Sequence, residues 1–382
     1  MAKYLPEFGW QPVVLTPLPD PRNSNYDLSI VPNLPSDLRR YGVDCASPHG
    51  ISTVLEQVVR IMQPQRHPYS LLRASRKMVA CVLREERIDA IWATVPPFNL
   101  LEIAALASRL SGRPWIADFR DAWQFVPNLF VRLTLPMRLN YERHLLESAA
   151  AVTAVSKGLA ETLEKRHRRR VCTISHGFDP ELCTQSLPKR TSKFSIVFTG
   201  GLVLGRPNFR PLLDAIARLV ARGEMDSRDV SIEFYGSDNA ARLADMFSGH
   251  PYAHLIVDHG YVPRMEAIEH QRNATVLLAA GHPSARGVIT SKLFEYITAG
   301  RPILAIPRDG DCIDEMLNET NSGISCTSVE EIERALSIFY LEWKSNGSVA
   351  HCARNDVISR YSSRNRASDL AQLLDKVANG DE

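Results

Sequence analysis

Short apolar runs alternate with longer stretches of helical periodicity along the whole chain. The runs are rich in β-branched and apolar residues and are bounded by glycine, proline and polar positions, a pattern typical of strands. The predicted strands are Gln11–Thr16, Ala90–Thr94, Trp115–Asp118, Ala151–Val155, Val171–Ile174, Phe194–Phe198, Ser231–Tyr235, Leu255–Val257, Thr275–Ala280 and Pro302–Ile306. Strands that alternate with helices indicate a parallel α/β architecture.

Helical periodicity fills the segments between the later strands. We predict helices over Asn99–Leu110, closed by Gly112, and over Leu139–Ala149. Another helix carries its apolar residues on one face: Phe209, Leu212, Leu213, Ile216 and Leu219. Two C-terminal segments, Asp356–Tyr361 and Ala367–Val377, are also predicted to be helical and to pack back on the first domain.

A chain of 382 residues with 45% apolar content is long enough for two cores of ordinary domain size. Residues 184–193 are polar and contain proline, which favours an interdomain linker. We therefore predict an N-terminal domain over residues 1–185, a C-terminal domain over 190–355 and terminal helices over 356–382.

The overall charge and the cysteines narrow the class of protein. The net charge of +2 indicates no general attraction to nucleic acid. The seven cysteines form no CxxC pair and show no metal-ligand spacing, so we expect free thiols in a reducing compartment. No apolar run reaches the roughly 20 residues that span a bilayer, and the N-terminus has no signal-peptide pattern. We expect a cytoplasmic protein, with attachment to the inner face of the membrane as an alternative.

The segment from Arg286 to Ile306 carries the most specific chemistry. It follows a predicted strand and is predicted to form a loop, a short helix with Ser291 as N-cap, a stop at Gly300 and another strand. The N–H groups at a helix N-terminus favour phosphate, and Lys292 adds a full charge there. Glu295 lies three residues later on the same side, where its carboxylate suits a ribose diol.

Other predicted strand ends in the second half should lie at the same edge, because the carboxyl ends of parallel strands meet at one edge of the sheet. Open parallel sheets bind their ligands at that edge. Gly200 and Gly201 would let the backbone approach a diphosphate, and Arg206 follows them. Gly236, together with Tyr261 and Val262, continues this edge. A simple turn is the alternative at each position, but the set predicts a nucleotide site.

The first half offers a charged group directly after a predicted strand. Asp118 and Asp121 flank Arg120, where they could hold sugar hydroxyls or accept a proton from an attacking alcohol. The alternative is a structural ion pair that fixes the loop. His176 either faces the cleft or shapes the hinge between the domains.

The order of the elements and five segments resemble a GT-B glycosyltransferase of the family 4 type over essentially the whole chain. The segments are DFRDAW (118–123), ERHLLESAAAVTAVSKGL (142–159), HGFDP (176–180), VFTGG (197–201) and SKLFEYITAGRPIL (291–304). The resemblance implies two Rossmann-like domains, a nucleotide-sugar donor on the C-terminal one, an acceptor on the N-terminal one and transfer with retention of configuration. It also implies that Arg206 and Lys292 stabilise the diphosphate without a required metal ion or other cofactor, and that Glu295 binds the ribose.

Three features depart from that family. Many members carry a glutamate eight positions before Glu295, where this chain has Gly287, so that backbone N–H groups of residues 284–290 would have to contact the donor sugar. The usual histidine of the N-terminal domain is replaced by the Asp118–Asp121 group. The chain also begins just before the second strand of such a fold, which predicts a gap in the middle of the first sheet and a true start upstream or a truncated gene.

Apolar and basic residues mix between Phe125 and Arg143, which suits a surface facing anionic lipid. An internal amphipathic helix is the alternative. The membrane hypothesis fits an acceptor carried on a polyprenyl lipid, as in cell-surface polysaccharide or glycolipid assembly.

These observations favour a retaining glycosyltransferase. Two alternatives stay open: a non-catalytic remnant that binds a nucleotide or a partner protein, and a nucleotide-sugar epimerase of the same fold. Epimerisation would need no acceptor, so turnover of the sugar without one distinguishes it.

Overall fold

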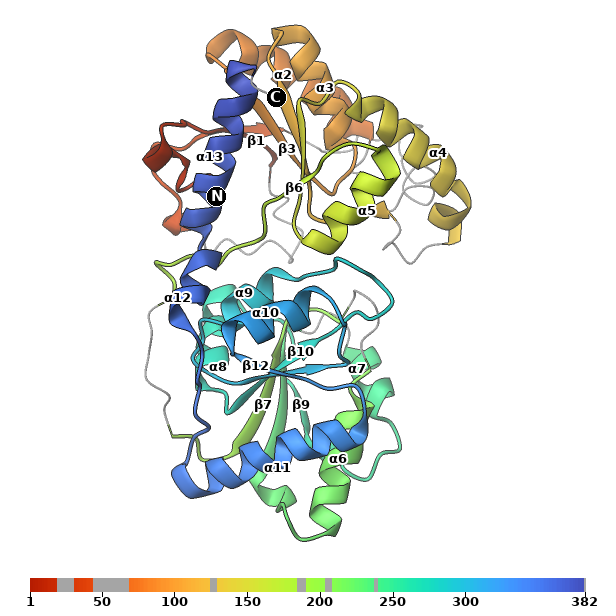
Figure 1. The fold of residues 1–382 in the computed structure, drawn as a ribbon, viewed down its shortest axis with the longest axis vertical. Coiled ribbons are helices and arrows are strands. Elements are labelled where there is room, and N and C mark those ends of the chain that lie inside the picture. The colour runs from red at the N-terminus through yellow and green to blue at the C-terminus, as the bar shows by residue number, and fades with distance from the viewer. Residues whose placement is uncertain are drawn as a thin grey trace. The chain divides into compact units, whose positions relative to one another are not determined.

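The computed structural model describes residues 1–18, 31–43, 69–123, 129–183, 190–202, 208–236 and 240–380. These residues form two compact units (Figure 1). Unit 1 comprises the described residues from Met1 to Ser175, except Val31, together with residues 364–380. Unit 2 comprises the described residues from His176 to Ser363. Arg206 lies outside the described residues, as does Phe125.

Unit 1 contains two parallel sheets. The first joins β1 (Val13–Pro17) to β2 (Arg39–Val43), and the second has the order β3–β4–β5–β6. The strands of the second sheet are β3 (Ile91–Val95), β4 (Trp115–Phe119), β5 (Ala151–Ala154) and β6 (Cys172–Thr173). Among the described strands no ladder joins β1 to β3, so pairing stops where the sequence predicts a gap.

Helices cover the strands of unit 1. They are η1 (Leu5–Phe8), η2 (Val31–Asn33), α2 (Tyr69–Glu85), α3 (Leu100–Ser111), α4 (Leu129–Leu146), α5 (Lys157–His167) and α13 (Ser363–Asn379). The C-terminal helix α13 buries Leu370 and Leu374 in one cluster with Tyr4, Ile116 and Ile174. The two ends of the described chain therefore share a core with the middle of the sheet.

Unit 2 is built on one parallel sheet of six strands in the order β12–β11–β10–β7–β8–β9. The strands are β7 (Phe194–Thr199), β8 (Val230–Tyr235), β9 (Ile256–Asp258), β10 (Val276–Ala280), β11 (Ile303–Ile306) and β12 (Gly323–Ser325). This order places β7 next to β10 in the middle of the sheet. Strands β8 and β9 extend the sheet on one side of β7, and β10, β11 and β12 extend it on the other, so the strand order reverses at this point. Such a switch point is where open parallel sheets bind ligands.

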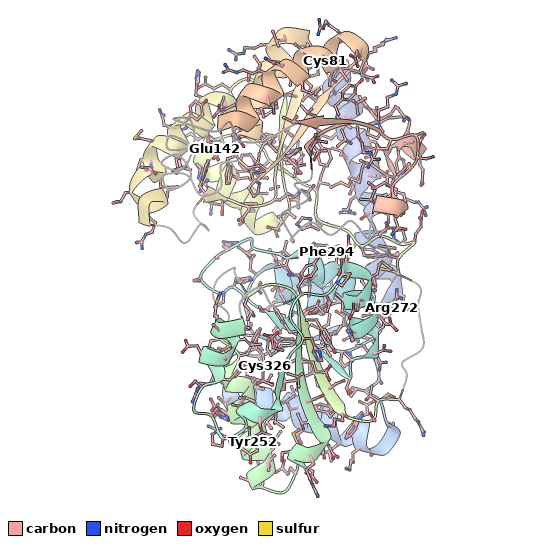
Figure 2. All side chains as sticks on the ribbon, turned by 180° about the vertical axis from the view of Figure 1, so that it is seen from behind. Cys81, Glu142, Tyr252, Arg272, Phe294 and Cys326 are labelled. Atoms are coloured by element: carbon pink, nitrogen blue, oxygen red, sulfur yellow. The ribbon has the colours of Figure 1, made fainter. Side chains whose placement is uncertain are left out.

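The helices of unit 2 complete its layers. They are α6 (Arg210–Ala221), η4 (Ser227–Asp229), α7 (Ala240–Phe247), η5 (Ala253–Leu255), α8 (Arg264–Asn273), α9 (Ser291–Tyr296), α10 (Cys312–Thr320), α11 (Val329–Asn346), α12 (Asn355–Ile358) and η6 (Ser359–Tyr361). The predicted apolar face of α6 is confirmed, because Phe209, Leu212, Leu213, Ile216 and Leu219 are all fully buried. In the view from behind, Tyr252 lies at the end of unit 2 opposite to Phe294 (Figure 2).

Several predicted elements differ from the structure. Helix α4 begins at Leu129 rather than Leu139 and ends at Leu146 rather than Ala149, and Pro136 lies inside it. Strands β2 and β12 and helices α2, α5, α7, α8, α10 and α11 were not predicted individually. β2 contains two arginines and β12 has three residues, so neither shows an apolar run that marks a strand.

Candidate functional site

The carboxyl ends of β7 and β8 come within van der Waals distance of each other at two glycines. Gly200 follows β7 with φ of +103°, and Gly236 follows β8 with φ of +83°. A Cβ on Gly236 would lie 3.2 Å from the Gly200 Cα. The Gly200 N–H donates to the Tyr235 carbonyl at 2.5 Å, and the Gly236 N–H donates to the Gly260 carbonyl at 2.5 Å. A Cβ on Gly236 would press against the Gly200 backbone, and both positions have positive φ, which accounts for the glycines.

Lys292 lies directly over Gly200. A Cβ on Gly200 would be 1.8 Å from Lys292 Nζ and 1.9 Å from its Cε. Lys292 is the second residue of α9, which follows the central strand β10 after a loop. The structure therefore brings together two of the predicted residues, a cation and a bare backbone, at the switch point of the sheet. Gly201, the next residue, is exposed.

Ser291 is not the N-cap of α9, contrary to the prediction. The cap is Thr290, whose backbone is extended with φ of −91° and ψ of 146°, and its side chain makes no capping hydrogen bond. Ser291 is the first helical residue and is exposed. The prediction was displaced by one residue because threonine and serine are both common caps and stand side by side here.

Glu295 is held by side chains of α8. Its Oε1 accepts from Arg264 Nε at 2.9 Å and forms an ion pair with Arg264 Nη2 at 2.7 Å, and its Oε2 accepts from Gln271 Nε2 at 3.3 Å. The Glu295 side chain is 12% exposed, against 38% for Arg264. The carboxylate is thus oriented from one side and still reachable from solvent.

Buried hydroxyls connect Glu295 to the end of β7. Gln271 Nε2 donates to Thr199 Oγ1 at 3.0 Å, and the Thr199 N–H donates to the Tyr296 hydroxyl at 2.8 Å. Burial raises the pKa of Tyr296 to about 12, so its hydroxyl keeps its proton. The network joins β7, α8 and α9, and it sets the position of Glu295 relative to Gly200.

The loop that leads into α9 is tied to the loop after β11. A Cβ on Gly281 would lie 1.7 Å from the Pro307 carbonyl oxygen, which explains the glycine at that position. Gly287 has φ of +86°, and its N–H donates to Asp311 Oδ2. The predicted use of backbone N–H groups from residues 284–290 therefore does not extend to Gly287 in this arrangement.

The remaining predicted residues of unit 2 lie near the end of β8 or at the start of the unit. Tyr261 is 56% exposed and Val262 is half-buried, both shortly before α8. Next to them, the Tyr235 ring is stacked between His259 and His270, with centroid distances of 4.2 and 3.8 Å. His176 is grouped with unit 2, where its ring meets Phe294 edge-on at 5.9 Å.

In unit 1, Asp118 is fully buried on β4. Its Oδ1 accepts from the Thr153 hydroxyl at 2.6 Å, and its Oδ2 accepts from the Thr94 hydroxyl at 3.1 Å and from Arg120 Nε at 2.6 Å. Burial raises the pKa of Asp118, while Arg120 and the two hydroxyls oppose that rise. This arrangement is the structural ion pair that the sequence left as an alternative.

Arg120 also contacts the backbone just after β6, the last strand of unit 1. Its side chain is 10% exposed, and its Nη1 donates to the Ile174 carbonyl at 3.2 Å. Asp121 is different, because it is half-buried and its Oδ1 accepts from the Ala122 N–H at 2.8 Å. Burial raises the pKa of Asp121 to about 6. Of the two carboxylates, Asp121 is therefore the one that solvent and a substrate can reach.

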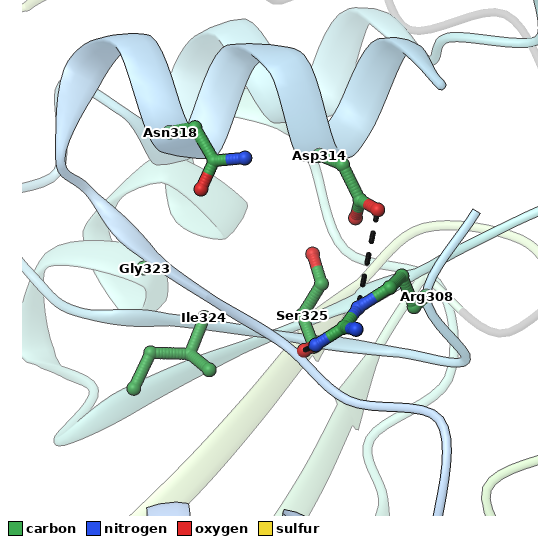
Figure 3. A pocket seen from close by; sticks show the side chains of 6 residues that line it. All are labelled: Arg308, Asp314, Asn318, Gly323, Ile324 and Ser325. Carbon is green, nitrogen blue, oxygen red and sulfur yellow. Dashed lines mark hydrogen bonds and ion pairs between the residues drawn. The ribbon is translucent and has the colours of Figure 1, made fainter. Parts of the chain in front are cut away.

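A cavity of about 420 Å³ lies at the edge of the sheet of unit 2, between α10 and β12 (Figure 3). It is lined by Arg308, Asp314, Asn318, Gly323, Ile324 and Ser325. None of these is a predicted site residue. Across it, the Arg308 guanidinium donates to the Ser325 carbonyl at 2.7 Å and lies 4.0 Å from Asp314.

Arg264, Gln271, Thr199 and Tyr296 were missed by sequence reasoning. Tyr296 adjoins Glu295 and could have been found by its place in the helix. Arg264 and Gln271 lie 31 and 24 residues before Glu295, and no spacing rule connects positions so far apart.

Comparisons with known proteins identify the family of both halves of the chain. The profile of a "Glycosyl transferase 4-like domain" matches residues 1–177, and that of a "Glycosyl transferase-like" domain matches residues 206–372. A search of curated protein sequences returned no significant match. No helix in the described part of the chain is long and apolar enough to cross a membrane.

Solved structures of glycosyltransferases share the fold. HepE of Anabaena in complex with UDP-glucose is 15% identical, with a TM-score of 0.61 over 89% of this chain and 86% of that one. Sucrose-phosphate synthase of Thermosynechococcus elongatus is 15% identical, with a TM-score of 0.66 over 99% and 92%. A glycosyltransferase of Rickettsia africae is 12% identical, with a TM-score of 0.65 over 98% and 92%. With both halves matched by glycosyltransferase profiles and the fold shared with these enzymes, the chain belongs to the group 1 glycosyltransferases of GT-B fold.

Proposed function

We propose that this enzyme transfers a sugar from a nucleotide-sugar donor to a hydroxyl acceptor with retention of configuration. The observation that carries the proposal is the position of Lys292 over Gly200, next to the oriented carboxylate of Glu295. Lys292 and the bare backbone suit a diphosphate, and Glu295 suits the ribose. Arg206, the other predicted diphosphate ligand, keeps that proposed role.

In this scheme the bond between the anomeric carbon and the diphosphate oxygen breaks first. Lys292 stabilises the negative charge on the leaving diphosphate, and the acceptor hydroxyl attacks the oxocarbenium-like sugar from the same face. Its proton passes to the leaving phosphate or to Asp121. The described residues contain no cluster of three or more metal-ligating side chains, and the scheme uses no metal ion. NMR of the anomeric proton in the product tests retention.

The first experiment is a thermal-shift screen of the protein with UDP, GDP, ADP and TDP and their sugars. UDP heads the screen because HepE, a structural neighbour, is known in complex with UDP-glucose. We expect one nucleotide at about 100 times its Kd to raise the Tm by about 2–4 °C. Glu295→Ala should abolish the shift.

The screen also separates the alternatives. A protein that melts cooperatively and responds to no nucleotide would contradict the proposed donor site and favour a remnant with another partner. Sugar turnover without any acceptor would favour an epimerase.

Asp121 should determine the pH dependence of transfer. Its pKa is raised from 3.8 to about 6, so the folded protein holds this proton more strongly than the unfolded chain. Between these two values stability falls as pH rises, and above pH 6 the ionised carboxylate costs about 3 kcal/mol. If Asp121 accepts the proton, activity should rise with pH through about 6.

Asp121→Asn removes both effects. We expect the variant to lack the acidic limb of the pH–rate profile and to melt higher than the wild type above pH 6. Glu147→Gln, an exposed acid in the same unit, is the control and should change neither. An acidic limb that persists in Asp121→Asn would mean that the leaving phosphate takes the proton.

The proposed acceptor is a glycan carried on a polyprenyl lipid, as in the assembly of cell-surface polysaccharide. Its support is a stripe on α4, where Leu133 is 72% exposed, Met137 is 74% exposed and Tyr141 is 46% exposed. The stripe lies on one face because its members are four residues apart. Arg132 and Arg143 are exposed on the same helix, but Arg138 is buried and stacks on Trp123 at 4.8 Å, so it does not contribute charge to this surface.

Exposed apolar residues beside arginines suit the surface of an anionic membrane. We expect the protein to sediment with phosphatidylglycerol vesicles at low salt, and Leu133→Ser/Met137→Ser to reduce the bound fraction at least about fivefold. Ile338→Ser/Leu341→Ser on α11 removes two apolar side chains that are 59% and 60% exposed and is the matched control. Equal binding by both variants would count against this membrane surface.

A further inference from the structure

The guanidinium of Arg264 covers one oxygen of Glu295. Its Nε donates to Oε1 at 2.9 Å, and its Nη2 lies 2.7 Å from the same oxygen in an ion pair. A carboxylate has about four accepting positions, two on each oxygen. Two guanidinium nitrogens within 2.9 Å therefore cover Oε1, while Oε2 accepts one bond from Gln271 at 3.3 Å and has about one position left.

The orientation of this pair is fixed by its surroundings. Arg264 is the first residue of α8 and Gln271 lies two turns later on the same helix, so a single element holds both oxygens of the carboxylate. Gln271 is buried and is held in turn by Thr199 at 3.0 Å. Rotation of the carboxylate to present Oε1 would break a charge-assisted hydrogen bond and a close ion pair, which are among the stronger contacts in proteins.

We propose that Arg264 is a positioning residue that restricts Glu295 to a single accepting oxygen, so that the ribose of the donor is recognised through one of its two hydroxyls. This inference rests on the proposed function, in which Glu295 binds the ribose. A carboxylate with both oxygens available would accept both hydroxyls of the diol equally. With Oε1 occupied, Oε2 accepts one hydroxyl and the other contributes little to the affinity.

The consequence is an unequal response to the loss of each hydroxyl. A hydrogen bond to a charged group is worth enough to change the Kd by about tenfold or more. We expect one of the two deoxy analogues, 2′-deoxy-UDP or 3′-deoxy-UDP, to bind at least about tenfold more weakly than UDP, and the other to bind within about threefold of it.

Calorimetric titration of the full chain with UDP and both analogues tests the proposal; if another base gives the larger thermal shift, its diphosphates replace them. In Arg264→Ala, Oε1 becomes available, and the ratio of the two analogues' Kd values should fall below about threefold. Arg264→Lys keeps the charge but cannot place two nitrogens on Oε1, so it should also reduce the ratio of the two Kd values. This second variant tests the proposal if the alanine variant does not fold. Arg218→Ala, which breaks the exposed pair of Arg218 and Glu330 on α6 and α11, is the control and should keep the wild-type ratio.

The outcomes separate this inference from the proposed function. Equal losses for both analogues in the wild type, or a ratio unchanged in the Arg264 variants, would overturn the role of Arg264 and leave the donor site in place. Undiminished UDP binding in Glu295→Ala, or no nucleotide binding by the wild type, would overturn both.

Discussion

Replacing Lys292 with alanine is expected to lower kcat about 100- to 1,000-fold, the usual cost of removing one group that stabilises developing negative charge. Lys292 crosses Gly200 at the end of β7, and its Nζ is the cation that the described residues place over that backbone. The charge on the diphosphate grows as the sugar departs, so the loss should fall on kcat more than on KM. Steady-state kinetics with the nucleotide-sugar identified by thermal shift measures it.

Gly200→Ala provides an independent way to remove the same group. Its Cβ would occupy the place of the Lys292 side chain, and φ of +103° strains any residue other than glycine. Because the lysine is flexible, we expect it to move away rather than the fold to fail, so that the alanine variant resembles Lys292→Ala in kcat.

Lys344→Ala is the control for both variants. Lys344 is an exposed lysine of the same unit that pairs with Asp229 at 2.7 Å. A Lys292→Ala enzyme with wild-type kcat would exclude the proposed role of this lysine, and the diphosphate charge would then have to be stabilised elsewhere.

Asp118→Ala is expected to destabilise the protein by about 3–5 kcal/mol, because removing one partner of a buried ion pair leaves the other charge uncompensated. Asp118 is fully buried and Arg120 is 10% exposed, so solvent cannot replace the lost carboxylate. Two hydroxyls, Thr94 and Thr153, would lose their acceptor as well. Urea denaturation followed by tryptophan fluorescence measures the change.

The chain contains a matched control for this effect. Asp226 and Arg228 have the same two-residue spacing and a similar separation of 2.7 Å, but their side chains are 39% and 89% exposed. Asp226→Ala should therefore cost about 1 kcal/mol or less.

The double variant Asp118→Asn/Arg120→Met tests the reason for the loss. It removes both charges and should recover part of the stability. An Asp118→Ala protein of normal stability that has lost transfer activity would contradict the structural role and restore the catalytic alternative.

The sequence by itself determined the α/β class, the parallel strands and the edge of unit 2 at which we propose the nucleotide site. Alternating apolar runs, the buried face of α6 and the glycines at strand ends are local signals, because they follow from backbone periodicity and sterics within a few residues. Between Ser291 and Ile306 the helix start and the strand were predictable to within about one residue, whereas α9 ends at Tyr296, before the predicted stop at Gly300.

The tertiary structure alone decided which charges meet. Arg264 and Glu295 are 31 residues apart and pair because α8 and α9 both lie beside β7, and the burial of Asp118 depends on Thr94 and Thr153 from neighbouring strands. Periodicity shows that a residue faces a core or an edge, but not which distant side chain it meets there. An ion pair depends on that long-range packing, and so the choice between Asp118 as structural and Asp121 as accessible needed the fold.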